Sequence, residues 1–190
     1  FIATASARAA GLGYAVPGAV AAVGVIAILS GTQGLIDPAW QALTGSVFPI
    51  LLTGGAAALI FAYLSRFAAA AIGPSEAALG RVTPALDGAA RTLGASPRET
   101  LWRVHWPLIA AGVCSAGLLV FVEVLKELPA TMILRPFNYD TLAIIAHNYA
   151  ADERLGEAAL PSLLIPLVAL IPMIFVARYL SRTRTPSGTG

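Results

Sequence analysis

Charge is scarce in this chain, and its scarcity excludes a domain surrounded by water. Charged residues make up 12% of the 190 residues, whereas hydrophobic residues make up 57% and the mean hydropathy is +0.78. A soluble domain carries about a quarter charged residues. The net charge of only +2 gives no reason to expect a nucleic-acid partner. The composition therefore predicts a polytopic membrane protein embedded in the lipid bilayer.

Cysteine and histidine are almost absent. The single cysteine, Cys114, cannot form a disulfide within the chain, and its apolar surroundings favour a packing role. The two histidines, His105 and His147, fall in segments predicted below to lie on opposite sides of the membrane, so we interpret both as packing or interfacial residues rather than metal ligands. No Gly-rich phosphate loop of the Walker type occurs, so we expect neither ATP hydrolysis by this chain nor a cofactor bound to it.

Four stretches without Asp, Glu, Lys or Arg are long enough to cross a bilayer as helices, which takes roughly 20 apolar residues. Gly31, Gly34 and Pro38 predict a loop at 31–48 between the first two spans. The expected fold class is all-α, a membrane helix bundle with a cytoplasmic helical hairpin. The expected spans are 12–30, 49–72, 106–126 and 158–179.

Lys and Arg residues fall mostly on one side of these spans. Three of the twelve, Lys126, Arg135 and Arg154, lie on the other side, and the loop between the first two spans carries none. By the positive-inside rule, both chain ends and residues 74–105 are cytoplasmic, whereas that loop and residues 127–157 face outward. The nine residues assigned to the cytoplasmic side are Arg8, Arg66, Arg81, Arg91, Arg98, Arg103, Arg178, Arg182 and Arg184.

The cytoplasmic insert begins with signals for a short helix over 84–93. Thr83 is placed as N-cap, Pro84 as the first helical residue and Gly94 as the residue that ends the helix. We expect Asp87 and Arg91 to pair across one turn. One face of this helix carries mainly small apolar side chains, which suits either insertion into a partner's groove or a position on the membrane surface. That apolar face consists of Leu86, Ala89, Ala90 and Leu93.

A second helix follows directly. Ser96 as N-cap, Pro97 at the first position and Glu99 at the third make a capping box. This helix runs on towards the third span, and Pro107 is expected to bend it where it enters the membrane. The insert therefore reads as a helical hairpin that turns at Gly94.

The stretch "GAARTLG", followed by "WRVHWPLI", resembles the cytoplasmic loop of the permease subunits of bacterial ABC importers. That family's pattern is Glu-Ala-Ala, three residues, Gly, and then about a dozen residues to an apolar–Pro pair. Ala89, Ala90 and Gly94 match it, whereas Gly88 stands at the Glu position and Asp87 carries an acid one place earlier. Literal "EAA" at Glu76 and Glu157 lacks the Gly at the matching distance.

A second stretch, "LKELPATMILRPFNYDTLAIIAHNYAADERLGEAALPSL", resembles the permeases of ferric-iron importers, which usually hold two such halves in one chain. The resemblance implies a type I importer fold for residues 1–190, as the C-terminal permease half of a longer chain. It implies a cytoplasmic coupling loop at 74–105 and a polar cytoplasmic tail at 181–190, in the bacterial inner membrane.

The resemblance also implies partners and contact residues. The partners are an ABC ATPase dimer that carries ATP and Mg²⁺, a periplasmic or lipoprotein solute-binding protein, and the other permease half or subunit. The protein itself would be a transport subunit, not an enzyme. The residues expected to couple it to the ATPase are Asp87, Gly88, Ala89, Ala90, Arg91, Leu93, Gly94, Ser96 and Pro97.

Charges at the outer end of the third span form a second candidate site. Glu123, Lys126 and Glu127 share one helical face, and charges near the membrane interior rarely face lipid. Two interpretations stay open: a Glu123–Lys126 ion pair that only packs the helices, or a gate of the pathway. The residues expected to form that gate are Glu123, Lys126, Glu127, Pro129 and Thr131.

Ferric iron prefers oxygen ligands, and four residues near this site carry them. The fixed charge of Lys126 and a permease's need for weak contacts argue against a tight metal site. We expect Asp140 to be the N-cap of a helix at 141–150. The candidate ligands are Glu123, Glu127, Tyr139 and Asp140.

Two alternatives to ferric iron transport remain. The cargo of the resembled permeases also includes thiamine, phosphonates and polyamines. A more remote alternative is an intramembrane enzyme that uses Glu123 or His105, which would need catalytic groups at one depth of the membrane.

Overall fold

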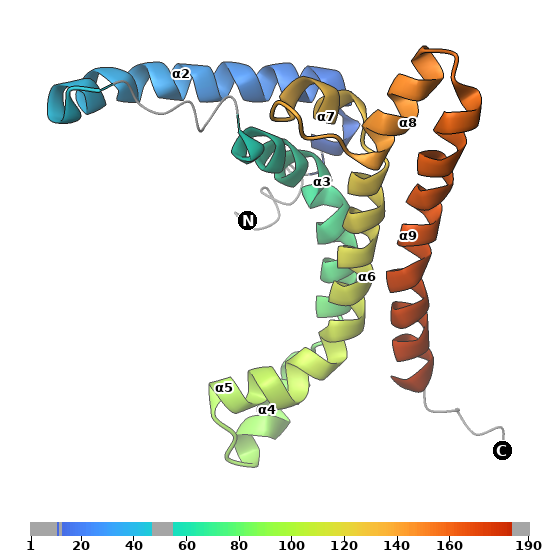
Figure 1. Ribbon diagram of the computed structural model, residues 1–190. Helices are drawn as coiled ribbons and strands as arrows, with labels where there is room; N and C mark the ends of the chain where they lie inside the picture. Colours follow the sequence, from blue (N-terminus) through green and yellow to red (C-terminus); the bar gives the residue numbers. More distant parts are fainter. Residues whose placement is uncertain (1–10, 12, 47–54, 184–190) are drawn as a thin grey trace. The chain divides into compact units, whose positions relative to one another are not determined.

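The computed structural model describes residues 11, 13–46 and 55–183, and the regular structure of this part is helical (Figure 1). A short connection joins α4 to α5 in the insert, and another joins α7 to α8 in the segment after the third span. The elements in chain order are α2 (Gly18–Thr44), α3 (Ala56–Leu79), α4 (Pro84–Thr92), α5 (Pro97–Thr100), the π-helix η1 (Leu101–His105), α6 (Trp106–Leu125), α7 (Pro129–Leu134), α8 (Leu142–Ala151) and α9 (Leu155–Thr183).

Four helices within the described residues are long and apolar enough to cross a membrane. They are Gly18–Thr44, Ala56–Leu79, the continuous rod Pro97–Leu125 and Leu155–Arg178. A helix satisfies its own backbone hydrogen bonds, which hydrocarbon cannot do. The predicted all-α membrane fold with four spans is thereby confirmed.

The predicted loop at 31–48 is wrong, because α2 continues through it to Thr44. Pro38 lies inside this helix. A proline removes one hydrogen bond from a helix, but the helix continues on both sides of it. The helix ends instead at Gly45, which has φ +70° and donates its N–H to the carbonyl of Gln41. α2 also starts at Gly18, later than expected, because Pro17 takes the N-cap position.

The second span ends later than predicted. The predicted start at residue 49 lies outside the described residues, but α3 runs on to Leu79 with Pro74 inside it. The helix therefore extends into the segment that we had taken as cytoplasmic loop from residue 74 onwards. Gly80 then closes α3 by donating its N–H to the carbonyl of Glu76.

The third span begins with a π turn. The N–H of Trp106 bonds to the carbonyl of Leu101, five residues earlier. Pro107 has no N–H to donate, so the regular pattern of bonds to the fourth preceding residue is broken here. The expected effect of Pro107 on this helix therefore takes the form of a widened turn at η1.

Helix α7 follows the third span and was not predicted as a helix. Pro129 occupies its first turn, a position that needs no N–H. Helix α8 confirms the helix predicted at 141–150, but its cap is Thr141, whose Oγ1 accepts the N–H of Ile144. The expected cap at Asp140 is therefore wrong by one residue.

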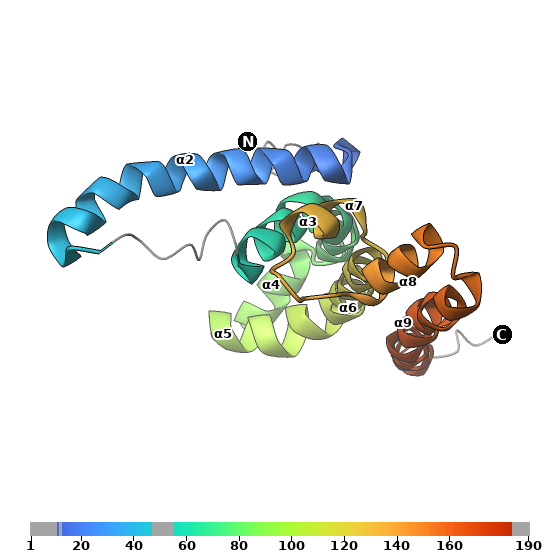
Figure 2. The same cartoon turned by 45° about the horizontal axis from the view of Figure 1, so that its top comes forward.

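Contacts divide the chain into two compact units, of residues 1–69 with 123–166 and of residues 70–122 with 167–190. In the first unit, α7 lies beside α2, and both views show it next to α3 as well (Figures 1 and 2). Small side chains let the three helices approach closely. The buried cluster between them consists of Ala22, Val25, Ala58, Leu59, Ala62, Ala130 and Leu134.

In the second unit, α3 and α6 approach closely at Gly112. A Cβ atom added there would overlap with the Cβ of Ala78 and come 3.1 Å from the carbonyl oxygen of Pro74. Gly112 is therefore the residue that allows this approach, as small residues do between membrane helices.

We predict that Gly112→Ala lowers the free energy of unfolding by about 1–3 kcal/mol, because one methyl group overfills this contact. The matched control is Gly117→Ala on the same helix, where an added Cβ meets nothing within 4 Å. Thermal unfolding in detergent measures both variants. Equal Tm values for the two would contradict the close α3–α6 contact.

Candidate functional site

The hairpin of residues 83–105 has the predicted cap positions, although the Thr83 side chain makes no capping hydrogen bond to α4. Thr83 precedes α4 at the N-cap position, with Pro84 in the first turn. The Ser96 Oγ accepts the N–H of Glu99 at 3.3 Å, and the Glu99 carboxylate accepts the N–H of Ser96 at 2.9 Å. The capping box predicted from the sequence is therefore present.

Gly94 makes the turn between the two helices. Its φ of +79° is a left-handed conformation that costs other L-residues roughly 1–2 kcal/mol. Its N–H bonds to the carbonyl of Arg91, and the N–H of Ala95 bonds to the carbonyl of Ala90, each at 3.0 Å. These bonds satisfy the last carbonyls of α4 and make the turn a defined structure.

The expected contact residues of α4 divide into an inner and an outer group. Ala90 is 6% exposed, so it packs within this chain, whereas Leu93 is 87% exposed. Gly88, Ala89 and Arg91 are exposed as well. Any partner of the hairpin would therefore meet Leu93 and its exposed neighbours rather than Ala90.

Asp87 faces its own chain and pairs with His105. The Asp87 Oδ1 lies 2.6 Å from the Nε2 of His105 in η1, and both side chains are partly buried. The expected pairing of Asp87 with Arg91 is thus replaced by a contact between the two arms of the hairpin. The interpretation of His105 as a simple interfacial residue is incomplete for the same reason.

In the first unit, Glu127 ties three elements together. Its carboxylate forms an ion pair with Arg66 of α3 and accepts the N–H of Ala130 in α7 at 2.9 Å. A Cβ added to Gly18 at the start of α2 would come 2.7 Å from the Glu127 Oε1. Glu127 is only 6% exposed, and a buried charge needs such partners to remain ionised.

This ion pair corrects the assignment of Arg66. The positive-inside count placed Arg66 on the cytoplasmic side, but the arginine lies within α3 and meets a residue of the segment assigned to the outside. Arg66 is therefore a bundle residue rather than a cytoplasmic anchor. Eight of the twelve Lys and Arg residues remain assigned to the cytoplasmic side, so the positive-inside rule still predicts the same orientation.

A second polar contact lies one helical turn from the ion pair. The hydroxyls of Tyr63 and Thr131 are 2.5 Å apart, and the Thr131 hydroxyl also donates to the carbonyl of Glu127 at 2.9 Å. Tyr63 and Arg66 are three positions apart on α3, so they share one face of that helix. Thr131 is completely buried. Two expected gate residues, Glu127 and Thr131, thus belong to one polar contact between α3 and α7.

Glu123 and Lys126 form a separate pair at the end of α6. Their charged atoms lie 2.8 Å apart, and Lys126 is 56% exposed. The ion pair predicted from the spacing is present. The expected common face with Glu127 is not, because α6 ends at Leu125 and the turn after it carries Glu127 into the buried cluster.

The candidate iron ligands are not gathered into a metal site. Asp140 forms an ion pair with Arg135, while Glu123 and Glu127 have the partners described above. Tyr139 is exposed. Among the described residues, no group of three or more His, Cys, Asp or Glu side chains is placed to hold a metal ion.

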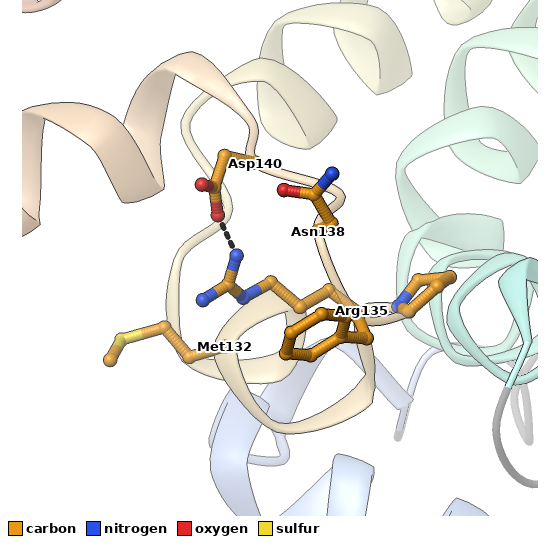
Figure 3. Close-up of a pocket in the computed structure, with 6 residues that line it drawn as sticks. Met132, Arg135, Asn138 and Asp140 are labelled. Atoms are coloured by element: carbon orange, nitrogen blue, oxygen red, sulfur yellow. Dashed lines mark ion pairs between the residues drawn. The ribbon is translucent and has the colours of Figure 1, made fainter.

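The loop between α7 and α8, together with Met132, lines an open hollow of about 440 Å³. Figure 3 shows the Arg135 side chain reaching across the loop to Asp140. This ion pair closes the loop, and Phe137 at its tip is fully exposed.

Sequence reasoning missed Tyr63 and the pairing roles of Arg66 and His105. Arg66 gave a signal, since an arginine within an otherwise apolar stretch implies a buried acidic partner. The helix spacing between Tyr63 and Arg66 gave another. The partner of each residue lies far along the chain, however, so no local pattern names it.

Known proteins with similar sequences are permeases. The chain is 27% identical over 121 residues to the Fe(3+)-transport system permease protein FbpB 2 of Haemophilus influenzae, covering 64% of this chain and 24% of that protein. It is 25% identical over 105 residues to the ferric transport system permease protein FbpB of Actinobacillus pleuropneumoniae, covering 55% and 15%. It is 29% identical over 108 residues to the inner membrane ABC transporter permease protein YdcU of Escherichia coli, covering 57% and 32%.

These matches span a third or less of each relative's length. No protein-family model matches the chain, and no solved structure does. The helical fold and its four spans define a multi-pass protein of the bacterial inner membrane. The resemblance of this chain to ABC importer permeases, of the ferric-iron type among others, is confirmed by the relatives.

We predict that Arg66→Met lowers the free energy of unfolding by about 3–5 kcal/mol, because it leaves Glu127 buried without its cation. Adding Glu127→Gln should recover most of the loss, since the glutamine oxygen still accepts the Ala130 N–H. Unfolding by SDS in mixed micelles measures each variant.

The control is Lys126→Ala, which breaks the exposed pair with Glu123 and should cost about 0–1 kcal/mol. If Arg66→Met costs no more than this control, the ion pair does not hold α3 to α7.

Proposed function

We propose that this protein is a transmembrane subunit of an ABC importer, forming part of the solute pathway and coupling it to a separate ATPase. The observation that carries the proposal is the hairpin of residues 83–105, in a chain that is similar to ABC permeases. We name this segment the coupling hairpin. The hairpin has a capped start, a glycine turn of fixed conformation and an exposed apolar residue, Leu93, at its end.

Coupling requires a stiff connection between the partner and the membrane helices. The rod from Pro97 to Leu125 joins the hairpin to the third span without a loop. When ATP and Mg²⁺ draw the ATPase dimer together, the docked hairpin moves with it. A helix transmits that displacement because its backbone hydrogen bonds resist bending.

The apolar surface of the spans supports a second permease half as partner. At most 22% of the apolar window of any described span is buried within the chain. The remaining surface needs lipid or further helices around it. We place the other permease half or subunit against part of this surface.

The outward segment supports a partner of a different kind. The loop closed by Arg135 and Asp140 presents Phe137 to the aqueous side, where an exposed apolar residue favours contact with protein. We propose the extracytoplasmic solute-binding protein as the partner of this loop.

The gate of the pathway is proposed at residues 123–131. This segment includes the exposed Glu123–Lys126 pair and the buried contacts of Glu127 and Thr131, with Pro129 as the start of α7 between them. Ion pairs that exchange partners give a segment two alternative packings. In this proposal the contacts of Glu127 and Thr131 stabilise one of these packings. The Glu123–Lys126 pair faces the solute.

Ferric iron is the proposed cargo, because relatives of this chain are named as ferric permeases. Glu123, Glu127 and Asp140 are each paired with a basic residue rather than grouped together, which suits passage of a cation through weak contacts. A pathway that bound iron tightly would retain it.

We predict that Leu93→Cys, in a Cys114→Ala background, forms a disulfide with cysteines engineered along the cleft of the ATPase. The matched variant Ala90→Cys should form none, since Ala90 is 6% exposed. Non-reducing gels of membranes that contain the complete transporter measure the product. Equal yields at both positions, or none at Leu93, would refute the docking.

We predict that the complete transporter in liposomes takes up radiolabelled ferric iron only when ATP and the solute-binding protein are present. Unlabelled thiamine, phosphonate or polyamine in excess should leave this uptake unchanged. Uptake of one of these solutes in place of iron would reassign the cargo but retain the importer.

A further inference from the structure

The two arms of the coupling hairpin are joined by one side-chain contact between residues 18 positions apart. The Nε2 of His105, at the end of η1, lies 2.6 Å from the Oδ1 of Asp87 in the middle of α4. A carboxylate oxygen accepts hydrogen bonds, and an imidazole Nε2–H can donate one to it. Both residues belong to the same compact unit.

The π turn sets the direction in which His105 points. A π turn takes one more residue than an α turn, and each residue of an α-helix advances by about 100° around the axis. If Leu101–His105 were α-helical, His105 would point in a different direction around the helix axis relative to the residues before the turn. The irregular turn at η1 therefore accompanies the contact between His105 and α4.

The contact with His105 also bears on the position of the acidic residue on α4. The acid lies at residue 87, whereas the permease pattern places it at 88. A Cβ at Gly88 would meet nothing within 4 Å, so this position faces open space. Asp87 lies about 100° away around the helix and faces His105. The acid of this hairpin thus contacts its own chain and is not presented to a partner.

We propose that His105 is a positioning residue that fixes the angle between α4 and the third span through Asp87. The inference rests on the proposed coupling function. The turn at Gly94 holds α4 through backbone bonds at one end only. The His105–Asp87 contact holds its middle, so a push on Leu93 moves the span rather than turning α4 about Gly94.

The experiment measures how many ATP molecules are hydrolysed per solute transported by the complete transporter in liposomes. His105→Phe and Asp87→Ala each remove the contact and should raise this ratio by about fivefold or more. The double variant should be no worse than the worse single variant, because both remove the same contact. A merely structural role would lower hydrolysis and transport together and leave the ratio unchanged.

Conservative variants test the hydrogen bond itself. In His105→Gln the amide still donates to Asp87, and in Asp87→Asn the amide oxygen still accepts from His105, so both ratios should stay within about twofold of the wild type. The control is Arg103→Gln, which removes an exposed charge from the same π-helix outside the pair.

Further outcomes separate this inference from the proposed function. If Leu93→Cys cross-links to the ATPase while His105→Phe and Asp87→Ala keep the wild-type ratio, the positioning role is overturned and the coupling function stands. If Leu93→Cys forms no cross-link and the wild type shows no ATP-driven transport, the coupling function fails. If the single variants do not assemble, the exchange Asp87→His with His105→Asp should restore the wild-type ratio, and failure to restore it would also overturn the inference.

Discussion

A chain with so few charges can bury an ionised group only beside a partner, and Glu127 satisfies this condition in the first unit. Its carboxylate meets Arg66, caps α7 and lies against the start of α2. An unpaired charge at this place would cost several kcal/mol. The buried core of alanine, valine and leucine fills the space between the same helices, so apolar packing and charge pairing select one arrangement together.

The same principle acts in the second unit at a smaller scale. The Asp87–His105 contact and the glycine turn give the hairpin one defined angle, while Gly112 lets α3 approach α6. Each feature removes a freedom that a membrane helix would otherwise have. The proposed coupling to an ATPase would depend on this loss of freedom.

Much of the fold could be predicted from local patterns. The length of the apolar stretches predicts that four membrane spans exist. The residue types at Ser96 and Gly94 predict where the helices of the hairpin begin and end. The ends of α2 and α3 could not be predicted, because Pro38 and Pro74 lie inside these helices and do not end them. The cap of α8 at Thr141 differs from the expected Asp140 because Asp140 pairs with Arg135 instead.

The sequence by itself determined the class of the protein, since hydropathy and capping act between residues close in the chain. It also located the hairpin of residues 83–105 and the charged end of the third span. Only the tertiary structure decided which charges meet. Arg66 and Glu127 are 61 residues apart, and Asp87 and His105 are 18 apart. The energy of such pairs depends on the distance and burial that folding creates, and neither is written in a local pattern.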